Sequence, residues 1–435
     1  MSWPVVTLDS IKADVPYACV GGPFGSNLTS KHYVDEGVPV IRGQNLGGPG
    51  CFNEAGFVFV TPEKADKLRP NLAFRGDLLF TQRGTLGQVG LIPQDSQYER
   101  YVVSQSQMKL TVDANRVDAR FVYQYFRLPS TIQEILNRTI TAGVPHINLG
   151  ILKAFEIPLP PLSIQRAIAE VAQTYDDLIA TNQRRIALLE DAARRLYREW
   201  FVHLRFPGHE SVPVMGVLPV GWRRMTLGEL CAEVPSASVQ TGPFGSQLHQ
   251  HDYKPDGVPV VMPQDIVGDR IRQDRISYVD ESTAARLARH ALQPLDIVFP
   301  RRGDIAKRAL VEAHQAGYLC GTGCLKISLP LEPLHPLVLY FQLADPIMVK
   351  WIEGQAVGAT MLNLSASILK AVSCLVPSLE VQSQFVAFVS GIRSQIDVME
   401  REIATAVQAR DLLLPKLMSG QLDVSGIRLP DEVAA

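Results

Sequence analysis

The sequence has no hydrophobic run long enough to span a membrane and no excess of either charge. A transmembrane helix needs about 20 consecutive apolar residues, and no such run occurs although 46% of the residues are hydrophobic. The formal net charge is −2, so the overall basic excess common in nucleic-acid-binding proteins is missing. We therefore expect no membrane partner, and any surface for an anionic partner must be built from locally gathered basic residues.

Cysteine is also scarce, with six residues scattered through the chain. This pattern is typical of reduced thiols rather than of a disulfide framework, and the first residues lack the layout of a secretory signal. We therefore expect a cytoplasmic protein. The pairs His249/His251 and Cys320/Cys324 have zinc-binding side chains, but their spacing matches no recognised zinc motif, so we expect no metal.

Sequence motifs for catalysis are missing as well. We find no glycine-rich loop with nucleotide-binding spacing, no acidic pair with a lysine for metal-dependent cleavage, and no Asn/Asp-Pro-Pro-Tyr/Phe motif of an amino-methyltransferase. No Ser, His and Asp arrangement can be defended from spacing alone. We expect no catalytic residue and no cofactor. A cryptic nuclease or methyltransferase is the alternative, which an assay of the chain alone would test.

The sequence contains an internal repeat of one large unit. Residues 22–46 and 242–266 share twelve identities at a constant displacement of 220. A period near half the chain indicates a tandem duplication rather than a solenoid. Further matches pair Trp3 with Trp222, Thr7-Leu8 with Thr226-Leu227, Asp77 with Asp296, Arg83-Gly84 with Arg302-Gly303, Asn148-Leu149 with Asn363-Leu364, and Gln165 with Gln382.

Each copy has a β-rich part followed by a helical part. Short apolar runs bounded by glycine and proline, such as 38–41 and 77–80, predict strands of a mixed domain. After Pro161, apolar residues recur three and four positions apart, as in a coiled-coil seam. The first predicted seam comprises Ile164, Ile168, Val171, Tyr175, Leu178, Ile186, Leu189, Ala193, Leu196 and Trp200; the second comprises Val381, Phe385, Phe388, Ile392, Ile396, Met399, Ile403, Ala406, Leu413 and Leu417.

Each predicted seam contains one stutter, where a step of four follows another step of four. Asn182 lies near the middle of the first seam, where a buried polar residue can fix register. A partly exposed asparagine at the stutter is the interpretation that we favour. Pro415 lacks the backbone donor and should end or kink the second helix near Leu414.

Two exposed seams in one chain are expected to pair with each other. The fold class is then α+β, with two pseudo-repeated domains joined by a long antiparallel two-helix coiled coil. If the two domains bind DNA, a rigid spacer between them would make them contact the duplex at two separate places. Because the copies differ in sequence, we expect two different half-sites with an unread gap between them.

The order of the motifs resembles the specificity subunit of type I restriction–modification systems over nearly the whole chain. The resemblance is carried by GPFGS and GVPV-x₃-Q in each repeat, the run 159–190, EWF with LPVGW at 199–222, and LLLPKLMSGQL at 412–422. It implies a non-catalytic subunit that reads double-stranded DNA. Its implied partners are two methyltransferase (modification) subunits and endonuclease/translocase (restriction) subunits, which supply adenine methylation and ATP-driven cleavage.

The resemblance also implies a domain plan. It consists of a first target-recognition domain at 1–160, a central spacer helix at 161–203, a second target-recognition domain at 204–378, a distal spacer helix at 379–422 and a tail at 423–435. Two further alternatives stay open: a specificity subunit that serves methylation only, and a scaffold that dimerises its partners without reading sequence.

The predicted DNA-contacting residues cluster around the repeated motifs. Gln44 and Gln264 recur in both copies, so we interpret them as structural or phosphate contacts rather than base readers. Their differing neighbours, Asn45 and Asp265, are better candidates for base contact, because Asn can bond to adenine and Asp to cytosine. Arg42 is a candidate for half-site difference, because IRGQN at 41–45 becomes VMPQD in the second repeat.

Basic residues supply the other candidates. Arg83 and Arg302 each follow a strand-like run and suit phosphate contact, with a surface ion pair as the alternative. For GPFGS we favour a tight turn anchored by a buried phenylalanine over a phosphate-cradling loop. The remaining basic candidates are Lys31, Arg75, Arg272, Arg275, Arg301 and Lys307.

Overall fold

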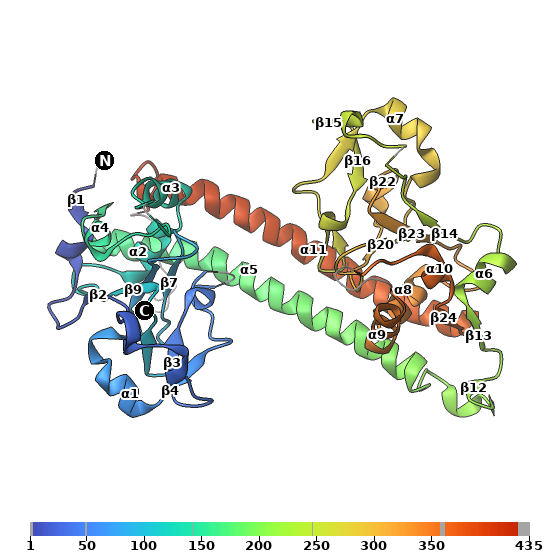
Figure 1. Ribbon diagram of the computed structural model, residues 1–435, viewed down its shortest axis with the longest axis horizontal. Coiled ribbons are helices and arrows are strands. Elements are labelled where there is room, and N and C mark those ends of the chain that lie inside the picture. The colour runs from blue at the N-terminus through green and yellow to red at the C-terminus, as the bar shows by residue number, and fades with distance from the viewer. Residues whose placement is uncertain (1–2, 48–49, 142, 246, 357–361, 425–435) are drawn as a thin grey trace. The chain divides into compact units, whose positions relative to one another are not determined.

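A computed structural model describes residues 3–47, 50–141, 143–245, 247–356 and 362–424 of the chain (Figure 1). The chain forms two compact units: unit 1 comprises residues 1–186 and 397–435, and unit 2 comprises residues 187–396. Both long helices, α5 (Leu162–Tyr197) and α11 (Leu379–Met418), contribute residues to both units.

Unit 1 is built on two four-stranded sheets. The first has the order β2-β9-β6-β7 and is antiparallel throughout; the second has the order β4-β3-β8-β5 and contains one parallel pair, β3 with β8. A separate pair, β1 and β10, brings the start of the domain beside its end. The strands are β1 (Val5–Thr7), β2 (Cys19–Gly21), β3 (Val38–Ile41), β4 (Val58–Val60), β5 (Leu72–Phe74), β6 (Leu78–Thr81), β7 (Val89–Leu91), β8 (Arg100–Val103), β9 (Gln107–Leu110) and β10 (Glu156–Pro158).

Unit 2 repeats this pattern. Its sheets have the orders β14-β23-β20-β21 and β15-β19-β16-β22, again with one parallel pair, β16 with β22, and β13 pairs with β24. The duplication seen in the sequence therefore extends to the strand topology, except at the edges of the second sheet. There unit 2 has β15 as an additional edge strand, and the counterpart of β5 is only a bridge between Ala291 and Leu319. The strands are β13 (Arg223–Thr226), β14 (Ser238–Thr241), β15 (Tyr253–Lys254), β16 (Val258–Val261), β19 (Ser277–Val279), β20 (Ile297–Pro300), β21 (Ala309–Leu310), β22 (Leu319–Cys320), β23 (Cys324–Ser328) and β24 (Ser373–Val376), with the short pairs β11 (Val214–Met215)/β12 (Leu218–Pro219) and β17 (Ile266–Val267)/β18 (Arg270–Ile271).

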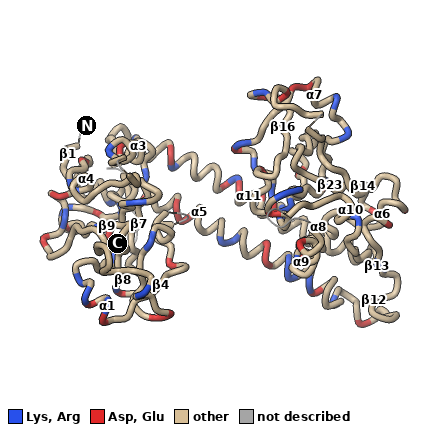
Figure 2. Tube along the Cα trace, viewed as in Figure 1, with Lys and Arg blue, Asp and Glu red and all other residues tan. Residues whose placement is uncertain are grey.

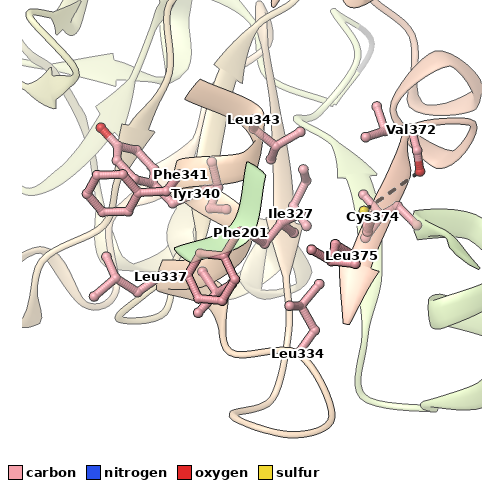
Figure 3. Close-up of a cluster of buried hydrophobic side chains, with 14 of the residues drawn as sticks. Phe201, Ile327, Leu334, Leu337, Tyr340, Phe341, Leu343, Val372, Cys374 and Leu375 are labelled. Atoms are coloured by element: carbon pink, nitrogen blue, oxygen red, sulfur yellow. Dashed lines mark hydrogen bonds between the residues drawn. The ribbon is translucent and has the colours of Figure 1, made fainter. Parts of the chain in front are cut away.

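Equivalent helices follow the strands in each unit. The short helices are α1 (Pro62–Lys67), α2 (Ala119–Phe126), α3 (Pro129–Asn137) and α4 (Leu149–Lys153) in unit 1, and α6 (Leu227–Glu233), α7 (Glu281–Arg286), α8 (Pro336–Ala344), α9 (Pro346–Gln355) and α10 (Ala366–Lys370) in unit 2. In unit 2, side chains from α8, β23, β24 and the π-helical turn Arg198–Val202 converge in one apolar core (Figure 3). Phe201, Ile327 and Phe341 are among them.

The repeated glutamines Gln165 and Gln382 hold the long helices to these domains. Gln165 accepts a hydrogen bond from the Asp118 backbone N–H (2.9 Å) and donates to the carbonyl of Pro160 (2.8 Å). Gln382 accepts from the His335 N–H (2.8 Å) and donates to the carbonyl of Pro377 (2.9 Å). Both side chains are buried, so their repetition has a structural reason.

One pair in the predicted repeat alignment is wrong by two residues. Asn148 caps α4, whereas the equivalent cap of α10 is Ser365 rather than Asn363. Backbone hydrogen bonds support this shifted alignment. Ile147 N–H donates to the carbonyl of Gln82, and Leu364 N–H donates to that of Arg301, so Ile147 and Leu364 are equivalent. The Asn-Leu dipeptide occurs in both copies, but at positions that are not structurally equivalent.

A buried ion pair recurs in the first sheet of each unit. Lys109 Nζ lies 2.9 Å from Asp77 Oδ2, and the two side chains are 5% and 2% exposed. Lys326 Nζ lies 3.2 Å from Asp296 Oδ2, with exposures of 8% and 4%. The repeated aspartates therefore belong to the domain interior, where each has a cationic partner on the neighbouring strand.

The two long helices have regular heptad patterns, and the predicted stutters are wrong. Leu178 is 44% exposed and Phe388 is 64% exposed, whereas their neighbours Ile179 and Val389 are buried. With these replacements the buried and half-buried positions alternate in steps of three and four. In α5 they are 168, 172, 175, 179, 182, 186, 189 and 193, and in α11 they are 385, 389, 392, 396, 399, 403 and 406.

Within unit 1 the segments of α5 and α11 run antiparallel. Asp176 on α5 contacts Arg410 on α11 (2.7 Å), and further along α5 Asn182 donates from Nδ2 to Glu402 Oε2 (2.9 Å). Asn182 is only 1% exposed, so the partly exposed position that we favoured is wrong, and the residue is a buried seam position. Such a polar pair suits the fixing of helix register.

Pro415 does not end the second helix. The helix α11 continues through Pro415 to Met418, and Leu414, Leu417 and Met418 pack into the core of unit 1. Packing of this last turn outweighs the loss of one backbone hydrogen bond. Among the helices of the described residues, none is long and apolar enough to cross a membrane.

Asp176 joins three helices of unit 1. It accepts hydrogen bonds from Arg127 (2.5 Å) and Gln124 (2.9 Å) at the end of α2 and from Arg410 on α11. Burial opposes ionisation of this carboxyl, but the hydrogen bonds and charges of these partners hold its pKa below the ordinary 3.8. A carboxyl with a lowered folded pKa contributes stability above its unfolded pKa and loses it as the pH falls through the folded value.

We expect Asp176→Asn to destabilise unit 1 at neutral pH and to have a progressively smaller effect below pH 3.8, as the wild-type carboxyl is protonated. Urea unfolding of both proteins between pH 7 and pH 3 measures this difference. Asp177→Asn, at an exposed position one residue away, is the control and should change the free energy of unfolding by less than ~0.5 kcal/mol. A difference between Asp176→Asn and wild type that does not vary with pH would contradict the expectation.

Candidate nucleic-acid interface

Four loops of unit 1 meet at one edge of its sheets. They are residues 22–27 after β2, 42–45 after β3, 82–84 after β6 and 104–106 before β9. Backbone hydrogen bonds join them, from Gly22 N–H to the carbonyl of Gln107 (2.9 Å) and from Gln82 N–H to that of Ser106 (2.7 Å). Three of the loops line one surface hollow, which includes Gly25, Arg42, Gly43 and Gln105. We call these four loops the loop face of unit 1.

Unit 2 forms an equivalent loop face from residues 242–245, 262–265, 301–303 and 321–323. Gly242 N–H donates to the carbonyl of Cys324 (2.9 Å), Arg301 N–H to that of Gly323 (2.7 Å) and Gly321 N–H to that of Val261 (2.9 Å). Each loop occupies the place of its counterpart in unit 1. The two faces therefore share a backbone frame and differ in the side chains that they carry.

Glycine is required where the first loop crosses the last. A Cβ atom at Gly22 would lie 1.9 Å from the carbonyl oxygen of Ser104, and one at Gly242 would lie 1.9 Å from that of Gly321. Both distances are far below van der Waals contact, so the backbones could not approach in this way with any other residue. These glycines fix the position of the GPFGS segment on each loop face.

The phenylalanine of GPFGS is not a buried anchor, so that prediction is wrong. Phe24 is 86% exposed and Phe244 is 55% exposed. The guanidinium carbon of Arg301 lies 5.8 Å from the centroid of the Phe244 ring, close enough for a cation–π contact. The tight turn is held by the neighbouring glycine and directs the ring outwards. Ser246 of the second motif lies outside the described residues.

Residues 26–191 match the family described as the type I restriction modification DNA specificity domain. Over these residues the chain is similar to the type I restriction–modification specificity family. The match begins at the last residue of GPFGS and ends on α5, so it includes three of the four loops of the unit 1 loop face, the end of the first loop and part of the long helix.

Curated relatives extend the similarity over most of the chain. The specificity subunit of the type I restriction enzyme MjaIX from Methanocaldococcus jannaschii is 22% identical, covering 80% of this chain and 78% of the relative. That of EcoBI from Escherichia coli is 20% identical, covering 74% and 70%. The crystal structure of a type I S subunit from M. genitalium has a TM-score of 0.58 at 17% identity and covers 96% of both chains, which is a likeness of fold.

The turn after β3 separates two of the predicted DNA contacts, Gln44 and Asn45. Gln44 is exposed and donates to the carbonyl of Gly56 (2.5 Å), as does Arg42 (2.9 Å). Asn45 is buried, accepts the Arg42 N–H (2.9 Å) and donates to the carbonyls of Asn53 and Ala55. The Asn45 amide thus supports the turn, and a base could reach it only if the turn opened.

The equivalent turn of unit 2 has the same division. Gln264 is exposed, while Asp265 is 3% exposed and accepts the Met262 N–H (2.8 Å). Burial raises the pKa of the Asp265 carboxyl. Asn45 and Asp265 therefore share one structural task despite their different chemistry.

The basic candidates do not all lie on the loop faces. Arg83 and Arg302 are exposed at equivalent positions after β6 and β20, and Arg301 precedes Arg302 on the same loop. Arg75 lies at the opposite end of β6, where it donates to the carbonyl of Ser96 (2.8 Å). The structure does not bring Arg75 to the loop face.

The other candidates are exposed on segments beside the faces. Lys31 lies in the turn Ser30–His32, Arg272 and Arg275 lie between β18 and β19, and Lys307 follows Arg302 before β21, 3.6 Å from Asp304. Arg272 N–H donates to the carbonyl of Asp265 (2.8 Å), which places it beside the 262–265 turn. Figure 2 shows basic and acidic residues interspersed along both units, which agrees with a net charge of −2.

The sequence reasoning missed two residues of the unit 1 loop face. Gln82 occupies the position of Arg301, and the Gln105 side chain bonds to the carbonyls of Gly25 (2.5 Å) and Leu28 (2.9 Å). Alignment of the repeats placed Arg83 opposite Arg302 and could have revealed the Gln82/Arg301 difference one position earlier. Nothing in the sequence pattern pointed to Gln105.

The cysteine and histidine pairs lie in different surroundings in unit 2. Within the described ranges, no group of three His, Cys, Asp or Glu side chains is placed to hold an ion. Cys320 and Cys324 lie in an apolar cluster of unit 2, where burial raises the pKa of Cys320 to about 12. His249 and His251 stack on each other with ring centroids 5.3 Å apart.

Proposed function

We propose that this non-catalytic type I specificity subunit binds a bipartite, asymmetric site on double-stranded DNA. The loop face of unit 1 reads one half-site and that of unit 2 reads the other. The observation that supports this most strongly is the pair of equivalent loop faces with different side chains, such as Gln82 and Arg301. Two faces with one frame and different side chains suit two different sequences.

The proposed partners are DNA, two adenine methyltransferase subunits and ATP-dependent endonuclease/translocase subunits, in the cytoplasm. The domain plan accompanies the proposal: recognition domains at 1–160 and 204–378, spacer helices at 161–203 and 379–422, and a tail at 423–435. A complex that only methylates is the narrower alternative. A scaffold that reads no sequence is the broader one.

The experiment is a binding titration of the full chain, with its methyltransferase subunits, on labelled duplexes at several salt concentrations. One duplex carries the motif that is methylated in cells with this chain, and the other has the same composition with both half-sites scrambled. We expect specific binding to be roughly 10³-fold tighter or more, with an affinity that falls as salt rises. Equal affinity for both duplexes would favour the scaffold and contradict the proposal.

Arg302→Ala is expected to weaken binding to every duplex by a similar factor and to reduce the slope of log affinity against log salt by about 1. The reason is that Arg302 recurs as Arg83 in a unit that differs elsewhere, so it suits phosphate rather than base contact. Arg195→Ala, at an exposed arginine on α5 paired with Asp191, is the control and should leave the slope unchanged. Loss of binding to the target duplex alone would assign Arg302 to base reading instead.

A further inference from the structure

The exposed phenylalanines of the two loop faces have no structural role that accounts for them. A phenylalanine in water forfeits the free energy of burial, yet Phe24 and Phe244 are 86% and 55% exposed. The same residue is exposed at the same place in both units. Because the ring is exposed in both copies of the duplicated unit, we infer a function that is performed when a partner covers the ring.

The backbone that carries each ring is held by hydrogen bonds and by a close crossing of two loops. Gly22 and Gly242 allow the close backbone crossing behind each ring. The Phe24 carbonyl accepts the Asn27 N–H (3.1 Å), and the Phe244 carbonyl accepts the Gln247 N–H (2.8 Å). Gln105 ties the unit 1 loop down from the other side through the Gly25 carbonyl. A pre-positioned ring loses little conformational entropy when it binds.

The surroundings of the rings favour nucleic acid over an apolar protein surface. Each ring belongs to a loop face that also carries exposed polar side chains, Gln44 in unit 1 and Gln264 in unit 2. The guanidinium carbon of Arg301 lies 5.8 Å from the Phe244 ring centroid. A cation at this place could pair with a DNA phosphate next to the base that the ring contacts. Because Phe is identical in both units while Gln82 and Arg301 differ, the ring suits a contact that does not depend on base identity.

We propose that Phe24 and Phe244 are aromatic wedges, each of which inserts against the base stack of its own half-site. Apolar side chains, phenylalanine among them, insert between base steps in other DNA-binding proteins and partly unstack them. The ring contributes affinity without reading sequence, and the polar residues beside it discriminate between bases. This inference rests on the proposed function and adds to it a sequence-independent contact in each half-site.

The test compares Phe24→Ala, Phe244→Ala and Phe24→Trp in the assembled complex, on the target and scrambled duplexes. We expect each alanine variant to lose affinity for both duplexes by a similar factor of about 5- to 100-fold, the range for loss of one aromatic–base stack. The salt slope should be unchanged because no charge is removed, and Phe24→Trp should restore most of the affinity. Phe388→Ala, which removes another exposed phenylalanine on α11, is the matched control and should bind DNA as wild type does.

A 2-aminopurine scan across each half-site adds a direct signature. Fluorescence should rise at a base step with wild type and not with the alanine variant of the corresponding unit. Unchanged affinity of both alanine variants would overturn the inference, as would a loss confined to the target duplex or the absence of any Phe-dependent fluorescence change. In each of these cases wild-type selectivity for the target leaves the proposed function standing. Failure of wild type to select the target would instead be failure of the proposed function.

Discussion

Lys109→Met is expected to lower the free energy of unfolding of unit 1 by about 3–5 kcal/mol. The substitution leaves the Asp77 carboxylate, 2% exposed, without the cation that lies 2.9 Å away. Asp77 keeps two hydrogen bonds, from the Phe74 N–H (2.9 Å) and the Thr111 hydroxyl (2.5 Å), but these do not neutralise a buried charge. Lys326→Met should act in the same way on unit 2, through Asp296.

Urea unfolding followed by hydrogen exchange in peptides from β6 and β9 measures the effect in unit 1. The matched control is Arg100→Met, which breaks the ion pair of Arg100 with Asp66 in the same unit. That pair has nearly the same separation, 2.7 Å, but its side chains are 35% and 64% exposed. Breaking it should cost about 1 kcal/mol or less. Similar decreases in the free energy of unfolding for Lys109→Met and Arg100→Met would contradict the expectation that burial makes the Asp77 ion pair more important for stability.

Gly242→Ala is expected to distort the loop face of unit 2 and to weaken DNA binding through that unit. The new Cβ would stand 1.9 Å from the Gly321 carbonyl oxygen, which is backbone and cannot rotate away. Overpacking of this kind costs about 1–3 kcal/mol and occasionally more. Separation of the two loops would also move Phe244 and Arg301, which the crossing holds in position.

Gly245→Ala supplies the control within the same motif, because nothing lies within 4 Å of a Cβ at that position. We expect it to unfold nearly as wild type does and to leave the crossing of the two loops intact. Titration on the target duplex and thermal unfolding of both variants measure the contrast. If Gly242→Ala were as mild as Gly245→Ala, the close crossing of the two loops would not be needed for the loop face.

The duplication and the fold class could be predicted from the sequence because identical residues at one displacement report a repeated frame directly. Gln165, Gln382, Asp77 and Asp296 recur because they hold that frame, through helix-end hydrogen bonds and buried ion pairs. These residues therefore recur because they stabilise the fold. The positions that differ between the two loop faces are the better candidates for DNA sequence recognition.

The seam positions, the exposure of Phe24 and the burial of Asn45 could not be predicted from the sequence, because each depends on the direction of a side chain in the folded chain. Leu178 and Ile179 are both apolar, so only the packed helix pair shows that Ile179 lies in the seam. A phenylalanine between glycines suggests a buried anchor by composition, but Phe24 is 86% exposed. Asn45 was a candidate for base contact by chemistry, and its burial and three hydrogen bonds became visible only with the turn in place.

Genome-wide mapping of methylated adenines tests the central claim most directly. Cells with the methyltransferase partner are compared with and without this chain, and then with a chain whose residues 1–160 come from another family member. We predict that one asymmetric, gapped motif is lost without the chain, and that the exchange changes only one half of that motif. An unchanged methylation map in an active system would contradict the account.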